Sequence, residues 1–109
     1  SATRFQMDTF SRTHVEEALK KLRSGSALFI DVRDYQSHVD GHIEPSFHLD
    51  ENNVKTLIDK TPKNRPLVVY CYHGHSSQLA AQFLIERGFS EVYNLEGGYE
   101  AWARAFETS

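Results

Sequence analysis

Two short, almost uninterrupted apolar runs constrain what this chain can fold into. They span residues 27–32 and 66–70 and read Ala-Leu-Phe-Ile-Asp-Val and Pro-Leu-Val-Val-Tyr. Runs of this length and composition are typical of strands that are buried on both faces of a sheet. Stretches with helical spacing of apolar residues separate the runs, so the sequence predicts an α/β fold in which crossover helices join parallel strands.

Shorter apolar segments predict the other elements. Further strands are expected at residues 5–7, 47–49 and 92–95, and a loop at 33–46 around Tyr35, Gly41 and Pro45.

A first helix is expected from Thr13, where Thr13 and Glu16 fit a capping box, to a stop at Gly25. A second is marked by Val54, Leu57 and Ile58 and ends before Pro62.

Two more helices are expected in the second half of the chain. One follows residue 77, stops at Gly88 and carries on one apolar face Leu79, Ala80, Phe83 and Leu84. The last is a short C-terminal helix whose Trp102 and Phe106, spaced i, i+4, are expected to pack in the core.

Size and composition favour one domain covering residues 1–109, because the chain has no repeat, linker or low-complexity tract. The net charge of -3 gives no basis for binding nucleic acid. No apolar run approaches the roughly 18 residues needed to span a bilayer, so no membrane partner is expected. The lone cysteine and the absence of a secretory signal at the start favour a reducing cytoplasm.

Cys71 is the only cysteine, so the chain cannot form an internal disulfide or an internal thiol relay. It follows the strand at 66–70 and precedes a helix, and ligands of open α/β sheets bind at the carboxyl ends of the strands. The free N–H groups and the positive end of that helix stabilise a thiolate or a bound anion. We therefore interpret Cys71 as a nucleophile rather than a small buried apolar residue.

The loop at 71–77, Cys-Tyr-His-Gly-His-Ser-Ser, has the composition of an anion-binding loop. Gly74 permits a tight turn and a close approach to a ligand. Ser76 and Ser77 offer hydroxyl groups and are expected to cap the helix. His73 and His75 offer hydrogen bonds. The expected substrate-binding residues are thus Tyr72, His73, Gly74, His75, Ser76 and Ser77.

Four segments together resemble a rhodanese domain over nearly the whole chain. They are residues 31–34 (Asp-Val-Arg-Asp), 41–43 (Gly-His-Ile), the loop at 71–77, and 95–102 (Leu-Glu-Gly-Gly-Tyr-Glu-Ala-Trp). The loop is especially similar to that of the GlpE-like group of small bacterial thiosulfate sulfurtransferases. The resemblance implies a three-layer α/β/α fold with a five-stranded, mainly parallel sheet.

The same resemblance implies a double-displacement reaction without a cofactor or a metal. Cys71 takes the outer sulfur of thiosulfate as a persulfide and releases sulfite. The sulfur then passes to cyanide or to a thiol, such as a dithiol or thioredoxin. Alternatives are a persulfide carrier in a sulfur-relay complex, a non-catalytic binding module and a thiol redox sensor.

One position departs from the wider family. Many rhodaneses have arginine five residues after the cysteine, whereas this chain has Ser76, as in the GlpE-like group. Modest affinity for thiosulfate is therefore expected. A cysteine phosphatase or arsenate reductase is a further alternative, but a phosphatase of that type needs arginine at the next position to bind the phosphoryl oxygens, and Ser77 stands there.

Other polar residues have simpler interpretations. Arg33 could face the site, but an ion pair with Asp31 or Asp34 is slightly favoured. His38 and His42 are spaced i, i+4, yet Gly41 lies between them and no carboxylate or second cysteine completes a metal site. Gly97 and Gly98 suffice for a tight turn from strand to helix.

Overall fold

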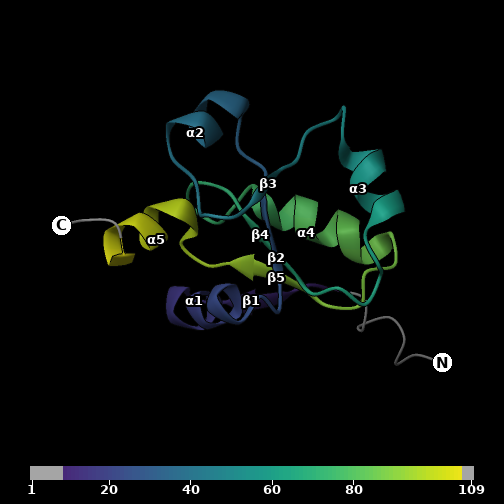
Figure 1. The fold of residues 1–109 in the computed structure, drawn as a ribbon, viewed down its shortest axis with the longest axis horizontal. Coiled ribbons are helices and arrows are strands. Elements are labelled where there is room, and N and C mark those ends of the chain that lie inside the picture. The colour runs from purple at the N-terminus through teal and green to yellow at the C-terminus, as the bar shows by residue number, and fades with distance from the viewer. Residues whose placement is uncertain (1–8, 107–109) are drawn as a thin grey trace.

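Five parallel strands form a single sheet at the centre of the molecule (Figure 1). The structure, a computed structural model, describes residues 9–106. The strands lie in the order β1-β5-β4-β2-β3. Their bounds are β1 Ser11–Thr13, β2 Leu28–Asp31, β3 Phe47–His48, β4 Leu67–Tyr70 and β5 Val92–Leu95. The α/β class and the parallel sheet expected from the apolar runs are confirmed.

Helices cover both faces of the sheet, which gives the expected three layers. They are α1 Val15–Ser24, α2 Tyr35–Asp40, α3 Val54–Lys60, α4 Ser77–Glu86 and α5 Gly98–Phe106. One apolar core joins α1 and α5 to the sheet through Ala18, Phe29 and Trp102. A second core, on the opposite face, joins α3 and α4 to it through Leu57, Val69 and Leu84.

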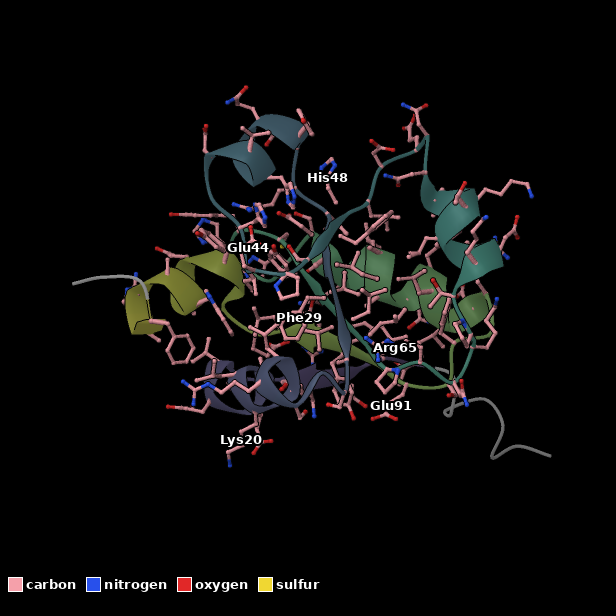
Figure 2. The ribbon with its side chains drawn as sticks, viewed as in Figure 1. Lys20, Phe29, Glu44, His48, Arg65 and Glu91 are labelled. Atoms are coloured by element: carbon pink, nitrogen blue, oxygen red, sulfur yellow. The ribbon has the colours of Figure 1, made fainter. Side chains whose placement is uncertain are left out.

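Successive residues of β2 and β4 therefore contribute to different cores, as strands buried on both faces must. Phe29 packs with the first core and Ile30 with the second. Figure 2 shows Phe29 between the sheet and the helices at the lower left, whereas Lys20 on α1 points away from the molecule. All four residues of β4 are buried, so the residue that follows this strand is held at a rigid position.

The first helix begins later than the capping box predicts. Thr13 is the last residue of β1 and pairs with Leu95, and its carbonyl accepts the N–H of Glu96 at 2.8 Å. His14 occupies the N-cap position without a side-chain hydrogen bond. The prediction was wrong because pairing with β5 holds the backbone of Thr13 extended. Gly25, with φ of 70°, ends the helix as expected.

Three other expectations need correction or qualification. The loop expected at 33–46 contains α2, whose N-cap Asp34 accepts the N–H of Ser37. On α4, Leu79 is 82% exposed, because the buried stripe runs through Ser77, Ala81 and Leu84. Phe106 contacts the ring of Trp102 but stays 38% exposed, so only Trp102 is a core residue. The strand expected at 5–7 lies outside the described residues.

Candidate functional site

Cys71 follows directly after β4, the middle strand of the sheet. The residue is 5% exposed, and the loop that begins with it leads into α4, which starts at Ser77. The buried strand and the helix together fix both ends of this loop. The sulfur is therefore placed at the carboxyl edge of the sheet, where the sequence predicts the reactive site.

Three hydrogen-bonding groups converge on the sulfur of Cys71. The backbone N–H groups of Gly74 and Ser77 point at Sγ, with N–S distances of 3.2 and 3.3 Å. The hydroxyl of Ser77 lies 3.2 Å from Sγ. Two backbone donors and a hydroxyl can stabilise negative charge on sulfur without any cationic side chain.

The pKa of Cys71 reflects a balance between burial and these donors. Burial raises the pKa of the thiol, but hydrogen bonds with the side chains of Ser77 and Ser76 and from the N–H groups of Ser77 and Gly74 outweigh it. The net result is a pKa below that of an ordinary cysteine. A larger fraction of the sulfur is thus thiolate, the nucleophilic form, at neutral pH.

The N-terminus of α5 holds the other side of the loop. The N–H of Tyr99 donates to the carbonyl of Cys71 at 2.8 Å, and the N–H of Glu100 donates to the carbonyl of Tyr72 at 2.9 Å. Gly98, with φ of 64°, makes this approach possible, because a Cβ there would lie 2.5 Å from the carbonyl oxygen of Cys71. The expectation that the two glycines form only a tight turn was too narrow, because Gly98 also lets the N-terminus of α5 pack closely against the loop.

The other side chains of the loop are open to solvent. Tyr72, His73, His75 and Ser76 are exposed. His73 Nδ1 lies 2.8 Å from a carboxylate oxygen of Glu100 on α5. Ser76 occupies the N-cap position of α4 without a side-chain cap, and the hydroxyl of Ser77 turns inward, so the expected capping by serine is wrong. Of the predicted site residues, Gly74 and Ser77 have groups within 3.3 Å of the sulfur of Cys71.

Arg33 forms the ion pair that the sequence favours. Its guanidinium binds both carboxylate oxygens of buried Asp31, at 2.9 and 2.7 Å, and donates to the carbonyl of Gly41 at 2.6 Å. It lines a cavity of about 230 Å³ together with Tyr72 of the loop. Its charge is neutralised by Asp31, and it joins the loop at 41 to the end of β2 rather than contacting the sulfur.

His38 and His42 stack on each other instead of converging on a common point. Their ring centroids lie 3.8 Å apart. Nδ1 of His38 lies 2.9 Å from Asp31, and Nδ1 of His42 lies 2.6 Å from the carbonyl of His38. Within residues 9–106, the structure contains no group of three His, Cys, Asp or Glu side chains that could hold a metal ion. Over the same residues, no helix is long and apolar enough to cross a membrane.

Asn94 is the site residue that the sequence did not indicate. It lies on β5, is fully buried, and its Oδ1 is 2.5 Å from the hydroxyl of Ser77. Its Nδ2 donates to the carbonyl of Gly74 at 3.1 Å. A single asparagine in a strand segment carries no local signal, and only the pairing of β5 beside β4 brings it under the loop.

Comparisons with known proteins agree with this architecture. The chain is similar to a rhodanese-like domain from Anabaena, at 26% identity and a TM-score of 0.78, over 87% of this chain and 74% of that one. It is also similar to a protein of unknown function from Rhodopseudomonas palustris, described as a possible tyrosine phosphatase, at 28% identity and a TM-score of 0.74, over 88% and 81% of the two chains.

A rhodanese-like domain protein from Staphylococcus aureus, 23% identical, shares the fold with a TM-score of 0.74 over 85% of this chain and 91% of that one. The family model of the rhodanese-like domain matches residues 14–105, which include all of the elements from α1 to α5 except the last residue of α5. By that match, this chain belongs to the rhodanese-like domain family.

Proposed function

We propose that this protein is a thiosulfate sulfurtransferase that carries sulfane sulfur as a persulfide on Cys71. The observation that carries the proposal is the set of hydrogen-bonding groups around the sulfur: two backbone N–H donors and the Ser77 hydroxyl, in a loop that follows a buried strand. Such a site stabilises an anionic sulfur without an arginine. Membership of the rhodanese-like domain family supports sulfurtransferase chemistry in general.

In the first half-reaction, the Cys71 thiolate attacks the outer sulfur of thiosulfate. A bond forms between Sγ and that sulfur, the bond between the two sulfurs of thiosulfate breaks, and its electron pair leaves on sulfite. The product is a persulfide whose outer sulfur carries the negative charge. The helix N-terminus and the open side of the loop, with His75 and Ser76 exposed, are available to that anion.

In the second half-reaction, an acceptor attacks the outer sulfur and the electron pair of the S–S bond returns to Sγ. Cyanide gives thiocyanate, and a thiolate gives a new persulfide. With a dithiol, the second thiolate then attacks the inner sulfur of that new persulfide, so that a disulfide forms and the outer sulfur leaves, with a proton, as hydrosulfide. We propose a dithiol or a thioredoxin-like protein as the thiol acceptor and a reducing compartment such as the cytoplasm, which keeps the lone cysteine reduced.

The exposed position of Ser76 supports a GlpE-like loop with modest affinity for thiosulfate. Where many rhodaneses carry an arginine, the loop offers a short hydroxyl side chain. Binding of the thiosulfate dianion then depends on backbone N–H groups, hydroxyls and the neighbouring histidine. We expect a KM for thiosulfate well above that of a loop with a fixed cation.

Phosphatase chemistry is the second candidate, because one structural neighbour is described as a possible tyrosine phosphatase. Such chemistry needs an arginine in the loop to stabilise the phosphoryl transition state. Here Ser77 is buried between Cys71 and Asn94, and Arg87 stands at the C-cap of α4, about 15 Å along the helix axis. These positions favour sulfur over phosphorus as the atom attacked.

Steady-state turnover tests the proposal. Thiocyanate formation from thiosulfate and cyanide should follow double-displacement kinetics and be absent in Cys71→Ser. Formation of one equivalent of persulfide without turnover would favour a carrier in a relay complex. Hydrolysis of an aryl phosphate that is lost in the same variant, without sulfur transfer, would refute the proposal.

A further inference from the structure

Cys71 is the first member of a chain of buried hydrogen bonds that crosses to β5. Its sulfur lies 3.2 Å from the hydroxyl oxygen of Ser77, which lies 2.5 Å from Oδ1 of Asn94. Ser77 and Asn94 are both fully buried. No solvent molecule is therefore needed to link the reactive sulfur to the asparagine.

The surroundings of Asn94 determine which way its amide points. Its Nδ2 donates to the carbonyl of Gly74 at 3.1 Å and to a carboxylate oxygen of Glu96 at 2.8 Å. A carbonyl and a carboxylate only accept, so the amide nitrogen must face them and Oδ1 must face Ser77. Because Oδ1 also only accepts, the single proton of the Ser77 hydroxyl is donated to Asn94.

This assignment fixes the direction of the bond to sulfur. When Cys71 is a thiol, its S–H donates to Ser77, whose O–H donates to Asn94, and each member has a partner. When the sulfur ionises, it becomes an acceptor, and the same hydroxyl proton is attracted to two acceptors. Turning it toward sulfur leaves Oδ1 of Asn94 buried without a donor, which is unfavourable.

We propose that Asn94 is a positioning residue that competes with the Cys71 thiolate for the hydroxyl proton of Ser77. Asn94 thereby favours the states in which Sγ bears no charge. The resting thiol is one such state. The persulfide is the other, because its charge lies on the outer sulfur and Ser77 can return its proton to Asn94. The asparagine thus limits loss of the thiol proton in the empty enzyme and stabilises the loaded form.

Other charged or titratable groups near this chain of bonds belong to the residue after β5, to β1, to the loop itself and to α5. Glu96, which follows β5, accepts from Asn94 and forms an ion pair with Arg12 of β1 at 3.0 Å. His73 and His75 belong to the loop itself, and His73 is bonded to Glu100 of α5. None of these groups is hydrogen-bonded to the hydroxyl of Ser77. A variant of Asn94 removes the bond to Glu96, whose ion pair with Arg12 remains, so the comparison with and without Ser77 separates the effect of Glu96 from that of the hydroxyl.

The test measures the reactivity of Cys71 in Asn94→Leu, which keeps the branched shape and the number of heavy atoms of the side chain and removes its acceptor. The rate of alkylation by iodoacetamide, in which Sγ bonds to carbon and iodide leaves, is followed against pH. At a pH below the midpoint of the profile we expect a rate about fivefold higher than in the unaltered protein, as for one hydrogen bond redirected to the thiolate. The midpoint itself should move to lower pH.

Gln78→Ala is the matched control for anchoring of the loop. Gln78 Nε2 donates to the same carbonyl of Gly74, at 3.0 Å, and the side chain takes no part in the hydrogen bonds that join Cys71, Ser77 and Asn94. If Asn94 merely anchored the loop, both variants would misplace the N–H of Gly74 and slow alkylation. Our proposal requires faster alkylation in Asn94→Leu and no increase in Gln78→Ala.

Ser77→Ala supplies the second check, because Asn94 is proposed to act only through that hydroxyl. In the Ser77→Ala background, Asn94→Leu should leave the pH profile unchanged. An unchanged or slower rate in Asn94→Leu alone, or an equal acceleration with and without Ser77, would overturn the proposal. Circular dichroism establishes folding, and Asn94→Ala, judged by the same outcomes, replaces the leucine variant if that does not fold.

The proposal rests on the proposed function only in treating Cys71 as the nucleophile. Alkylation needs no sulfur donor, so the two can fail separately. If the pH profile of alkylation shifts in Asn94→Leu but the protein never accepts sulfur, only the proposed sulfurtransferase function is refuted. Turnover of thiosulfate with an unshifted profile in Asn94→Leu would refute the role of Asn94 alone.

Discussion

Gly98→Ala tests how firmly α5 holds the reactive loop. Gly98 has φ of 64°, in the left-handed region, and an added Cβ would lie 2.5 Å from the carbonyl oxygen of Cys71 and closer still to that of Tyr72. Contacts this short with backbone atoms force the helix and the loop apart. The change therefore acts on the site through the carbonyl groups of the loop, without altering any side chain of the site.

The magnitude follows from the contacts that would be lost. A left-handed conformation costs a residue with a Cβ about 1 kcal/mol or more. Separation of the helix also weakens the two hydrogen bonds from Tyr99 and Glu100 to the loop, each contributing about 1 kcal/mol. We expect Gly98→Ala to lower the free energy of unfolding by about 3 kcal/mol and to slow alkylation of Cys71.

Gly25→Ala is the matched control. Gly25 has φ of 70°, yet an added Cβ would have nothing within 4 Å, so this variant isolates the conformational cost of about 1 kcal/mol. Urea unfolding measures the difference of about 2 kcal/mol, which corresponds to about 1 M in the midpoint for a slope near 2 kcal/mol/M. Equal midpoints for the two variants, with unchanged reactivity of Cys71 in Gly98→Ala, would refute the reasoning.

Three further predictions concern individual side chains. Burial raises the pKa of Asp31, but hydrogen bonds from Arg33 and His38 outweigh it and leave the pKa below 3.8. That stabilisation is present above the unfolded-state pKa of the carboxyl group and is lost as pH falls through its folded-state pKa. Asp31→Asn should therefore lower the free energy of unfolding by about 3 kcal/mol at pH 7, and should make this free energy depend less on pH in the acid range. Ser76→Arg should lower the KM for thiosulfate about fivefold by adding a cation to the loop, whereas Ser76→Gln should not. The Thr13 hydroxyl is buried without a partner, so Thr13→Val should leave the thermal midpoint unchanged or raise it, and a clear fall would contradict this.

Strand and helix positions were predictable where local sequence and tertiary structure agree. The runs at 27–32 and 66–70 can be buried only in the middle of a sheet, and they became β2 and β4. Gly25 ends its helix in the conformation that glycine favours. The start of α1 was wrong because pairing of Thr13 with β5, a contact between distant segments, overrides the capping pattern. The six-residue α2 was missed, although aspartate at position 34 is a favoured N-cap residue and could have indicated the start of a helix.

Part of the site was predictable for the same reason. The loop at 71–77 is contiguous, so its position after a buried strand predicted where Cys71, Gly74 and Ser77 would lie. The inward turn of the Ser77 hydroxyl depends on Asn94, which lies 17 residues further along the chain. The close approach of Gly98 to the loop likewise depends on how α5 packs against it. Such contacts leave no pattern in the local sequence.

The most direct test of the central claim is the intact mass of the protein after incubation with thiosulfate and removal of the small molecules. We predict a gain of one sulfur atom, located on Cys71, that is lost on adding cyanide or a dithiol and is absent in Cys71→Ser. An unchanged mass after incubation with thiosulfate and with other sulfane-sulfur donors would contradict the claim that Cys71 carries a persulfide.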